Sequence, residues 1–139
     1  MSLQEYYVLT GYSFFFYGLF LFILMVALLL LQVWTLSRRL DVHLFNENYF
    51  TQQEIAMFSS FPLSLLKTLA YIRLITFPNS LRKRFGDATA RDKISIFDLF
   101  ISHLTMLILS IEVLILLNFI FAMMLNYILL EFVDGAGEV

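Results

Sequence analysis

Cysteine is absent from this 139-residue chain, which also has only five glycines, two prolines and 14% charged residues. Without a thiol, the chain can form no disulfide, no cysteine-ligated iron–sulfur cluster and no covalent haem attachment. Its sequence contains no glycine-rich phosphate loop, H-E-x-x-H or G-x-S-x-G pattern. We therefore expect a protein that is not an enzyme and that has no cofactor or metal site.

Long hydrophobic blocks take the place of these motifs, because 60% of the residues are hydrophobic. The first block, from Tyr7 to Trp34, has no charged residue, and the second, from Leu99 to Leu130, has only Glu112. About 20 apolar residues span a bilayer core, so each block is long enough to cross it and the second should tilt or extend beyond it. The predicted fold is an all-α integral membrane protein whose two transmembrane helices form a hairpin.

The blocks divide the chain into four parts. These are an outer N-terminus with the first transmembrane helix (1–37), a cytoplasmic or interfacial helical segment (38–98), the second transmembrane helix (99–130) and an acidic outer tail (131–139). The first block is too long for a signal peptide and has neither a basic start nor a small-residue cleavage site. We expect it to stay in the mature protein.

Basic residues occur only between the two blocks, at Arg38, Arg39, Lys67, Arg73, Arg82, Lys83, Arg84, Arg91 and Lys93. The positive-inside rule therefore predicts a multi-pass protein of the bacterial inner membrane with both termini outside. We expect contacts with lipid headgroups from Arg38, Arg39, Arg82, Lys83 and Arg84. Nine basic against six acidic residues give segment 38–98 a net charge of only +3, which argues against a nucleic-acid partner.

Short helices are predicted within the middle segment. Thr51 and Glu54 have the spacing of a capping box, which predicts a helix that begins near Gln52. A second helix should begin close to Pro62 and end before Pro78. We expect this pair to be interfacial or re-entrant and to lie against the cytoplasmic leaflet with its basic residues toward the headgroups.

A solvated basic turn is expected next, in "NSLRKRFGDATARDK" from residue 79 to residue 93. Gly86 and Asp87 suit a loop, and Asp92 could cap the second long helix.

Polar side chains form two stripes on the second long helix when each residue is placed about 100° after the last. One stripe contains His103, Ser110 and Asn118, and the other contains Thr105, Glu112 and Asn126. Unpaired polar groups are costly in lipid, so both stripes should contact protein. Gly11 and Gly18 lie seven residues apart on the first helix, where small residues allow another helix to come close.

These features favour an accessory or assembly subunit of a larger respiratory, photosynthetic or transport complex, which binds other integral membrane subunits. A homo-oligomer is the alternative arrangement. A second hypothesis is a small oligomeric ion or proton transporter that uses Glu112, because ionisable residues inside membranes often mark ion pathways.

Two other kinds of site remain open. His43 follows the first block and His103 lies near the start of the second, so the two could share a haem, although interfacial hydrogen bonding explains each of them more simply. The aromatic run from Tyr6 to Phe22 could stack on a lipid, quinone or pigment, but an interfacial belt of tyrosines, with phenylalanines that contact lipid or another helix, explains it more simply.

The fragments "YFT" at 49–51 and "YIRL" at 71–74, together with the two-span layout, resemble universal stress protein B, a small bacterial membrane protein. The resemblance covers roughly residues 38–110 and implies a stress-related membrane protein in which no catalytic residue is known. The aromatic first block and the acidic end "EFVDGAGEV" depart from that pattern.

Overall fold

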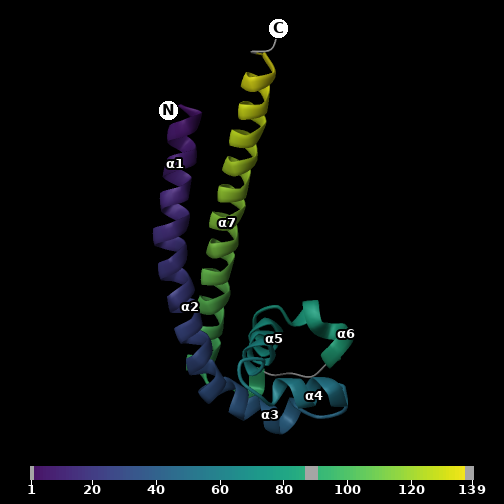
Figure 1. The fold of residues 1–139 in the computed structure, drawn as a ribbon. Coiled ribbons are helices and arrows are strands. Elements are labelled where there is room, and N and C mark those ends of the chain that lie inside the picture. Colours follow the sequence, from purple (N-terminus) through teal and green to yellow (C-terminus); the bar gives the residue numbers. More distant parts are fainter. Residues whose placement is uncertain (1, 87–90, 137–139) are drawn as a thin grey trace. The chain divides into compact units, whose positions relative to one another are not determined.

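Two long helical runs dominate the computed structural model, which describes residues 2–86 and 91–136 (Figure 1). Helix accounts for 87% of the structure, and the described residues form no strand, so the predicted all-α fold is confirmed. The two runs include Leu3–Leu44 and Ile96–Phe132, which are both long and apolar enough to cross a membrane.

The first run is helical without a break from Leu3 to Leu44, seven residues beyond the predicted boundary at 37. Two five-residue π-helical turns interrupt its α-helical pattern. In chain order it consists of α1 (Leu3–Ser13), η1 (Phe14–Gly18), α2 (Leu19–Gln32), η2 (Val33–Ser37) and α3 (Arg38–Leu44).

The second run is the single helix α7, from Ile96 to Ala136. Ser95 caps it, because its hydroxyl accepts the Asp98 N–H at 3.1 Å while the Asp98 carboxylate accepts the Ser95 N–H at 3.4 Å. The prediction of Asp92 as the cap was wrong, since Asp92 lies in the short η4 (Arg91–Lys93). Beyond residue 130 the helix continues to Ala136, and the last part of the predicted tail lies outside the described residues.

Between the runs, α4 (Gln52–Phe58) begins where predicted, and Thr51 and Glu54 form the expected capping box. The next helix, α5 (Ser64–Thr76), begins two residues after Pro62 and ends before Pro78, which confirms the second helix.

The predicted basic turn was wrong in its first part, which instead forms η3 (Pro78–Leu81) and α6 (Arg82–Phe85). Phe85 lies buried in the core, and this burial explains why the basic residues before it are held in a helical turn. Gly86 follows with φ of 58°, a conformation that favours glycine, so α6 ends there. Asp87 lies outside the described residues.

The chain divides into two compact units. The first unit contains residues 1–24 and 109–139, and the second contains residues 25–108. The second unit has a hydrophobic core made of Leu29, Leu36, Leu40, Leu44, Phe50, Tyr71, Ile72, Leu74, Ile75 and Phe85. This core joins α5 and α6 to the lower end of the first run.

Asp41 binds α5 to α3 through two polar contacts. The Lys67 Nζ lies 2.8 Å from one carboxylate oxygen, and the Tyr71 hydroxyl donates to the other at 2.9 Å. Lys67 is buried rather than turned toward headgroups, and its Nζ lies 4.1 Å from the ring centroid of Phe45. Burial, together with the negative charge of Asp41, raises the pKa of Tyr71 far above its ordinary value, so this tyrosine remains a hydrogen-bond donor.

Replacing Lys67 tests this network. Lys67→Ala removes the charge-assisted hydrogen bond to the half-buried Asp41 and should lower the free energy of unfolding of the second unit by about 2 kcal/mol. Lys83→Ala removes an exposed lysine and should change it by less than about 0.5 kcal/mol. Thermal unfolding in detergent, followed by circular dichroism, compares the two. Equal midpoints for both variants would show that the buried pair does not stabilise the unit.

The pH dependence of stability tests the contact between α4 and α6. Hydrogen bonds from the Thr51 N–H and the Arg84 guanidinium lower the pKa of Glu54 below its ordinary value of 4.5. A lowered pKa in the folded state means that this stabilisation is present above pH 4.5 and is lost as the pH falls through the lowered pKa. Unfolding titrations between about pH 6 and pH 3 should therefore show a smaller loss of stability in Glu54→Gln than in the parent.

Candidate functional site

The face of α7 that contacts protein repeats alternately every three and four residues. Its buried or half-buried members are Asp98, Ile101, Thr105, Ile108, Glu112, Ile115, Phe119, Ala122 and Asn126. This spacing is the 3.5-residue period of helices that pack side by side. The stripe predicted to meet an external partner, with Thr105, Glu112 and Asn126, therefore lies on the face of α7 that packs within the chain. Thr105 is fully buried and donates to the carbonyl of Ile101.

In the first unit, the Phe119 side chain packs against α1 and η1. Its ring stacks on Phe14 with centroids 4.7 Å apart and on Tyr7 at 6.5 Å. Gly11 lies opposite, where an added Cβ would be 3.8 Å from Phe119 Cε2, an ordinary van der Waals distance. One turn earlier along α1, the Tyr6 hydroxyl donates to Asn118 Oδ1 at 2.9 Å. Asn118, expected to bind an external partner, thus has an intramolecular one.

A groove beside Glu112 is the best candidate for a binding site in the first unit. It has a volume of about 360 Å³ and is lined by Phe14, Phe15, Gly18, Leu19, Phe22, Glu112, Ile115 and Leu116. Glu112 is the one ionisable residue in this set, and its Oε1 is buried with no hydrogen-bond partner among the described residues. We call this feature the Glu112 groove. It brings together two predicted site residues, Gly18 and Glu112.

The π-helical turn η1 supplies three of the residues that line the groove: Phe14, Phe15 and Gly18. Such a turn widens the helix locally, and π-helical turns inside α-helices frequently lie at functional sites. Gly18 has no side chain to fill the groove, and an added Cβ there would contact only Phe14 of its own helix, at 3.9 Å. The sequence therefore leaves this space open beside a carboxyl group.

The remaining stripe residues lie apart from the groove. His103 and Ser110 are exposed, and His103 Nδ1 lies 2.8 Å from the carbonyl oxygen of Leu99 in its own helix. Asn126 is half-buried further along α7. His43, the other candidate haem ligand, is exposed in the second unit.

Several basic residues predicted to contact headgroups also have partners in the protein. Arg39 pairs with Asp98 at 2.9 Å, and Arg84 pairs with Glu54 at 2.7 Å. The Arg38 guanidinium lies 4.4 Å from the ring centroid of Trp34, an arrangement suited to a membrane interface. Arg82 and Lys83 are exposed.

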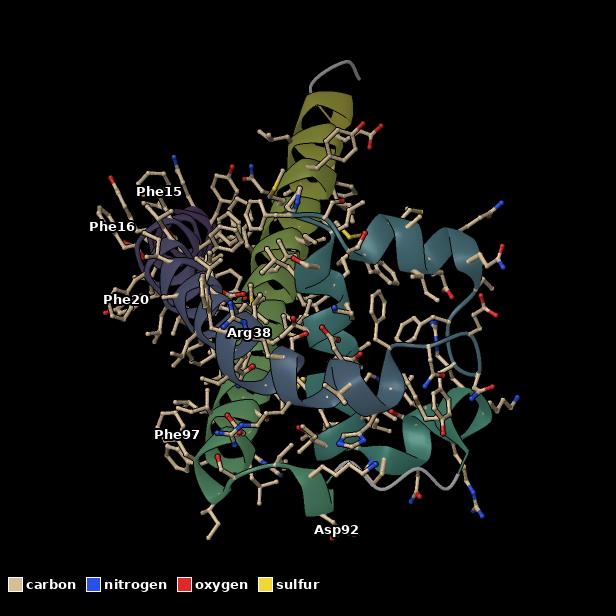
Figure 2. All side chains as sticks on the ribbon, turned by 90° about the horizontal axis from the view of Figure 1, so that it is seen from below. Phe15, Phe16, Phe20, Arg38, Asp92 and Phe97 are labelled. Carbon is tan, nitrogen blue, oxygen red and sulfur yellow. The ribbon has the colours of Figure 1, made fainter. Side chains whose placement is uncertain are left out.

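The aromatic side chains of the first run are largely exposed. Figure 2 shows Phe15, Phe16 and Phe20 projecting outward from their helix, and each is more than 60% exposed. This exposure is what lipid-facing phenylalanines would show. It adds no feature specific for a quinone or pigment.

Two polar residues were missed by the sequence analysis. Gln32 and Ser102 are buried in the second unit, and neither the Gln32 amide atoms nor the Ser102 hydroxyl has a hydrogen-bond partner among the described residues. A signal for Gln32 was available, because it is a lone amide inside the apolar run "ALLLLQVW". Ser102 gave no comparable signal, since serine often bonds its own helix.

Neither a search for a metal site nor comparison with known proteins indicates a function for this chain. Within residues 2–86 and 91–136, no three histidine, aspartate or glutamate side chains gather where they could hold a metal ion. No family model, curated protein or solved structure matches the chain.

Substitutions at Gly11 and Phe119 test the packing of the first unit. Gly11→Ala should retain the stability of the helix pair, because the added methyl group meets Phe119 at an ordinary distance. Phe119→Ala removes both ring contacts and should lower stability by about 1 kcal/mol or more. Unfolding by increasing mole fractions of sodium dodecyl sulfate in mixed micelles measures both. A loss with Gly11→Ala as large as with Phe119→Ala would contradict this packing.

Proposed function

We propose that this chain is a non-catalytic accessory or assembly subunit of a larger membrane complex, and that a partner transmembrane segment docks at the Glu112 groove. The proposal includes a membrane topology, in which the two long helices cross a bacterial inner membrane and the middle segment lies at its cytoplasmic face. The nine basic residues between the spans support that orientation.

The observation that carries the proposal is the unpaired Glu112 Oε1 beside an open and otherwise apolar groove. In a membrane, a carboxyl group has no water to bond and gains by meeting a polar side chain of another helix. The Glu112 side chain is among those that line the groove. The partner that fits is therefore a helix with apolar side chains and one hydroxyl or amide at the depth of Glu112.

Helix length supports a protein partner as well. The candidate spans contain 42 and 37 residues, which correspond to about 63 Å and 55 Å of helix, whereas the hydrocarbon core is about 30 Å thick. Apolar side chains remain exposed near the ends of the first unit, at Val8, Leu9, Tyr127, Ile128, Leu130 and Phe132. A neighbouring subunit could cover such surface where the bilayer does not reach.

Changing Glu112 tests the docking. Glu112→Leu should weaken association with the partner roughly 3-fold to 30-fold, the equivalent of a lost interhelical hydrogen bond of about 0.6–2 kcal/mol. Glu112→Gln keeps hydrogen-bonding atoms and should preserve the complex. The measurement is native electrophoresis of a tagged chain extracted from its membrane in mild detergent, with mass spectrometry of the subunits that accompany it.

Asn126→Leu is the matched control, because it removes a half-buried polar side chain of α7 that does not line the groove. This variant should leave the complex intact. A complex that survives Glu112→Leu unchanged, or a chain that migrates alone in every extract, would contradict docking at the groove.

Ion or proton transport is the second candidate, favoured by the same carboxyl group. The two functions predict different effects of Glu112→Gln on ion or proton flux. For transport, the glutamine variant should assemble normally but lose ion or proton flux in proteoliposomes, because an amide cannot bind and release a proton at neutral pH. Docking predicts that the parent chain carries no such flux.

A further inference from the structure

The corner between α4 and α5 exposes large apolar side chains without a charge beside them. Residues 55–66, "IAMFSSFPLSLL", contain no charged residue. Within them, Met57 is 51% exposed, Phe61 71% and Leu66 52%. We call these three side chains the apolar corner. Three exposed apolar side chains of this size in an uncharged segment are unusual on a surface in contact with water, so they indicate an interaction site.

The hydroxyl groups around the apolar corner are already bonded within the chain. Ser59 donates to the carbonyl of Ala56 at 2.8 Å, and Ser60 donates to that of Met57 at 3.1 Å. Five backbone N–H groups are bonded as well: those of Ser59, Ser60, Ser64, Leu65 and Leu66 donate to the carbonyl oxygens of Ile55, Met57, Ser60, Pro62 and Leu63. Among the described residues, the N–H groups of Phe61 and Leu63 have no backbone acceptor. Pro62 has no N–H to satisfy. Internal bonding of most of these polar groups lowers the cost of contact with hydrocarbon.

Charges at both ends of the segment are paired. On the α4 side, Glu54 binds Arg84, and on the α5 side the buried Lys67 binds Asp41. Neither pair leaves a free charge directed at the apolar corner. A typical protein interface, in contrast, has a rim of polar residues around its apolar centre.

The second unit also contains the ends of both long helices, which would lie at the membrane boundary. Met25–Leu44 and residues 96–108 belong to it, and Leu99 and Met106 of α7 pack against the core formed with α5. Figure 1 shows α5 beside the lower part of α7. Trp34, with Arg38 over its ring, has the character of a residue at the boundary between headgroups and hydrocarbon. The apolar corner is therefore part of the unit that adjoins lipid.

We propose that Met57, Phe61 and Leu66 insert into the cytoplasmic leaflet and contact lipid acyl chains, which anchors the α4–α5 pair to the membrane surface. This inference rests on the membrane topology of the proposed function. It goes beyond that topology by assigning the lipid contact to three side chains. The partner is the lipid itself rather than another protein.

Site-specific fluorescence tests the insertion, and the absence of cysteine makes single labelling sites simple to introduce. Phe61→Cys and Met57→Cys, each labelled with a nitrobenzoxadiazole dye, are placed in nanodiscs of phosphatidylethanolamine and phosphatidylglycerol. We expect blue-shifted emission, at least twofold quenching by phospholipids with a doxyl group near the headgroup end of the acyl chain, and protection from iodide.

Two other positions serve as controls. Gln53→Cys, an exposed polar position on α4, should be quenched by iodide and little affected by doxyl lipids. Ile23→Cys, an exposed position near the middle of the first apolar span, should be quenched by phospholipids with a doxyl group near the methyl end of the acyl chain, whether or not the apolar corner inserts.

The outcomes separate the proposals. Doxyl quenching at residues 57, 61 and 23, but not at 53, supports insertion. Quenching at residue 23 alone overturns insertion and leaves the transmembrane topology intact, while no quenching at any of these sites overturns both. If residues 57 and 61 are shielded from both iodide and doxyl lipids, a protein surface covers the apolar corner and the lipid contact is wrong.

Discussion

An apolar environment offers polar groups no water, so a polar side chain on a long apolar helix needs a partner within the protein. Most such side chains here have one. Tyr6 binds Asn118 in the first unit, and Arg39 binds Asp98 in the second. Thr105 bonds its own helix. Against this background, the unpaired groups stand out, and Glu112 is one that lines an open groove.

The second unit meets the same requirement with charges instead of neutral groups. Asp41, near the end of the first helical run, binds the buried Lys67 and the hydroxyl of Tyr71. Losing Asp41 would leave Lys67 buried and without its charge partner, so this contact holds α5 in one position on α3. With α5 held on α3, the turn between α4 and α5 lies at the surface of the second unit, where Met57, Phe61 and Leu66 are exposed.

Much of the fold could be predicted from the sequence because its signals are local. Long uncharged blocks predict the two helical runs, and Thr51 with Glu54 marks the start of α4. Long-range pairing, by contrast, has no local signal. Neither the burial of Lys67 against Asp41 nor the burial of Phe85 follows from the residues around them, so the sequence alone predicts Lys67 at the headgroups and a turn in place of α6.

The candidate site is likewise predictable from the sequence only where its signals are local. Angular placement found that Thr105, Glu112 and Asn126 share a face, but it could not say whether that face meets this chain or another. Its apolar neighbours held the missing signal: Ile101, Ile108 and Ile115 alternate with Thr105 and Glu112 at spacings of three and four, which is the pattern of a packed helix pair. Gly18 was correctly noted as a small residue, but its place beside Glu112 depends on how the two helices pair.

The π-helical turn at Phe14–Gly18 sets the rotational register of the chain before it. Such a turn holds one more residue than an α-helical turn, as if a single residue had been inserted. Each residue turns an α-helix by about 100°, so the extra one decides which side of α1 faces α7. The same short stretch that opens the Glu112 groove therefore also directs Tyr6 to Asn118, and an evolutionary deletion within it would alter both features together.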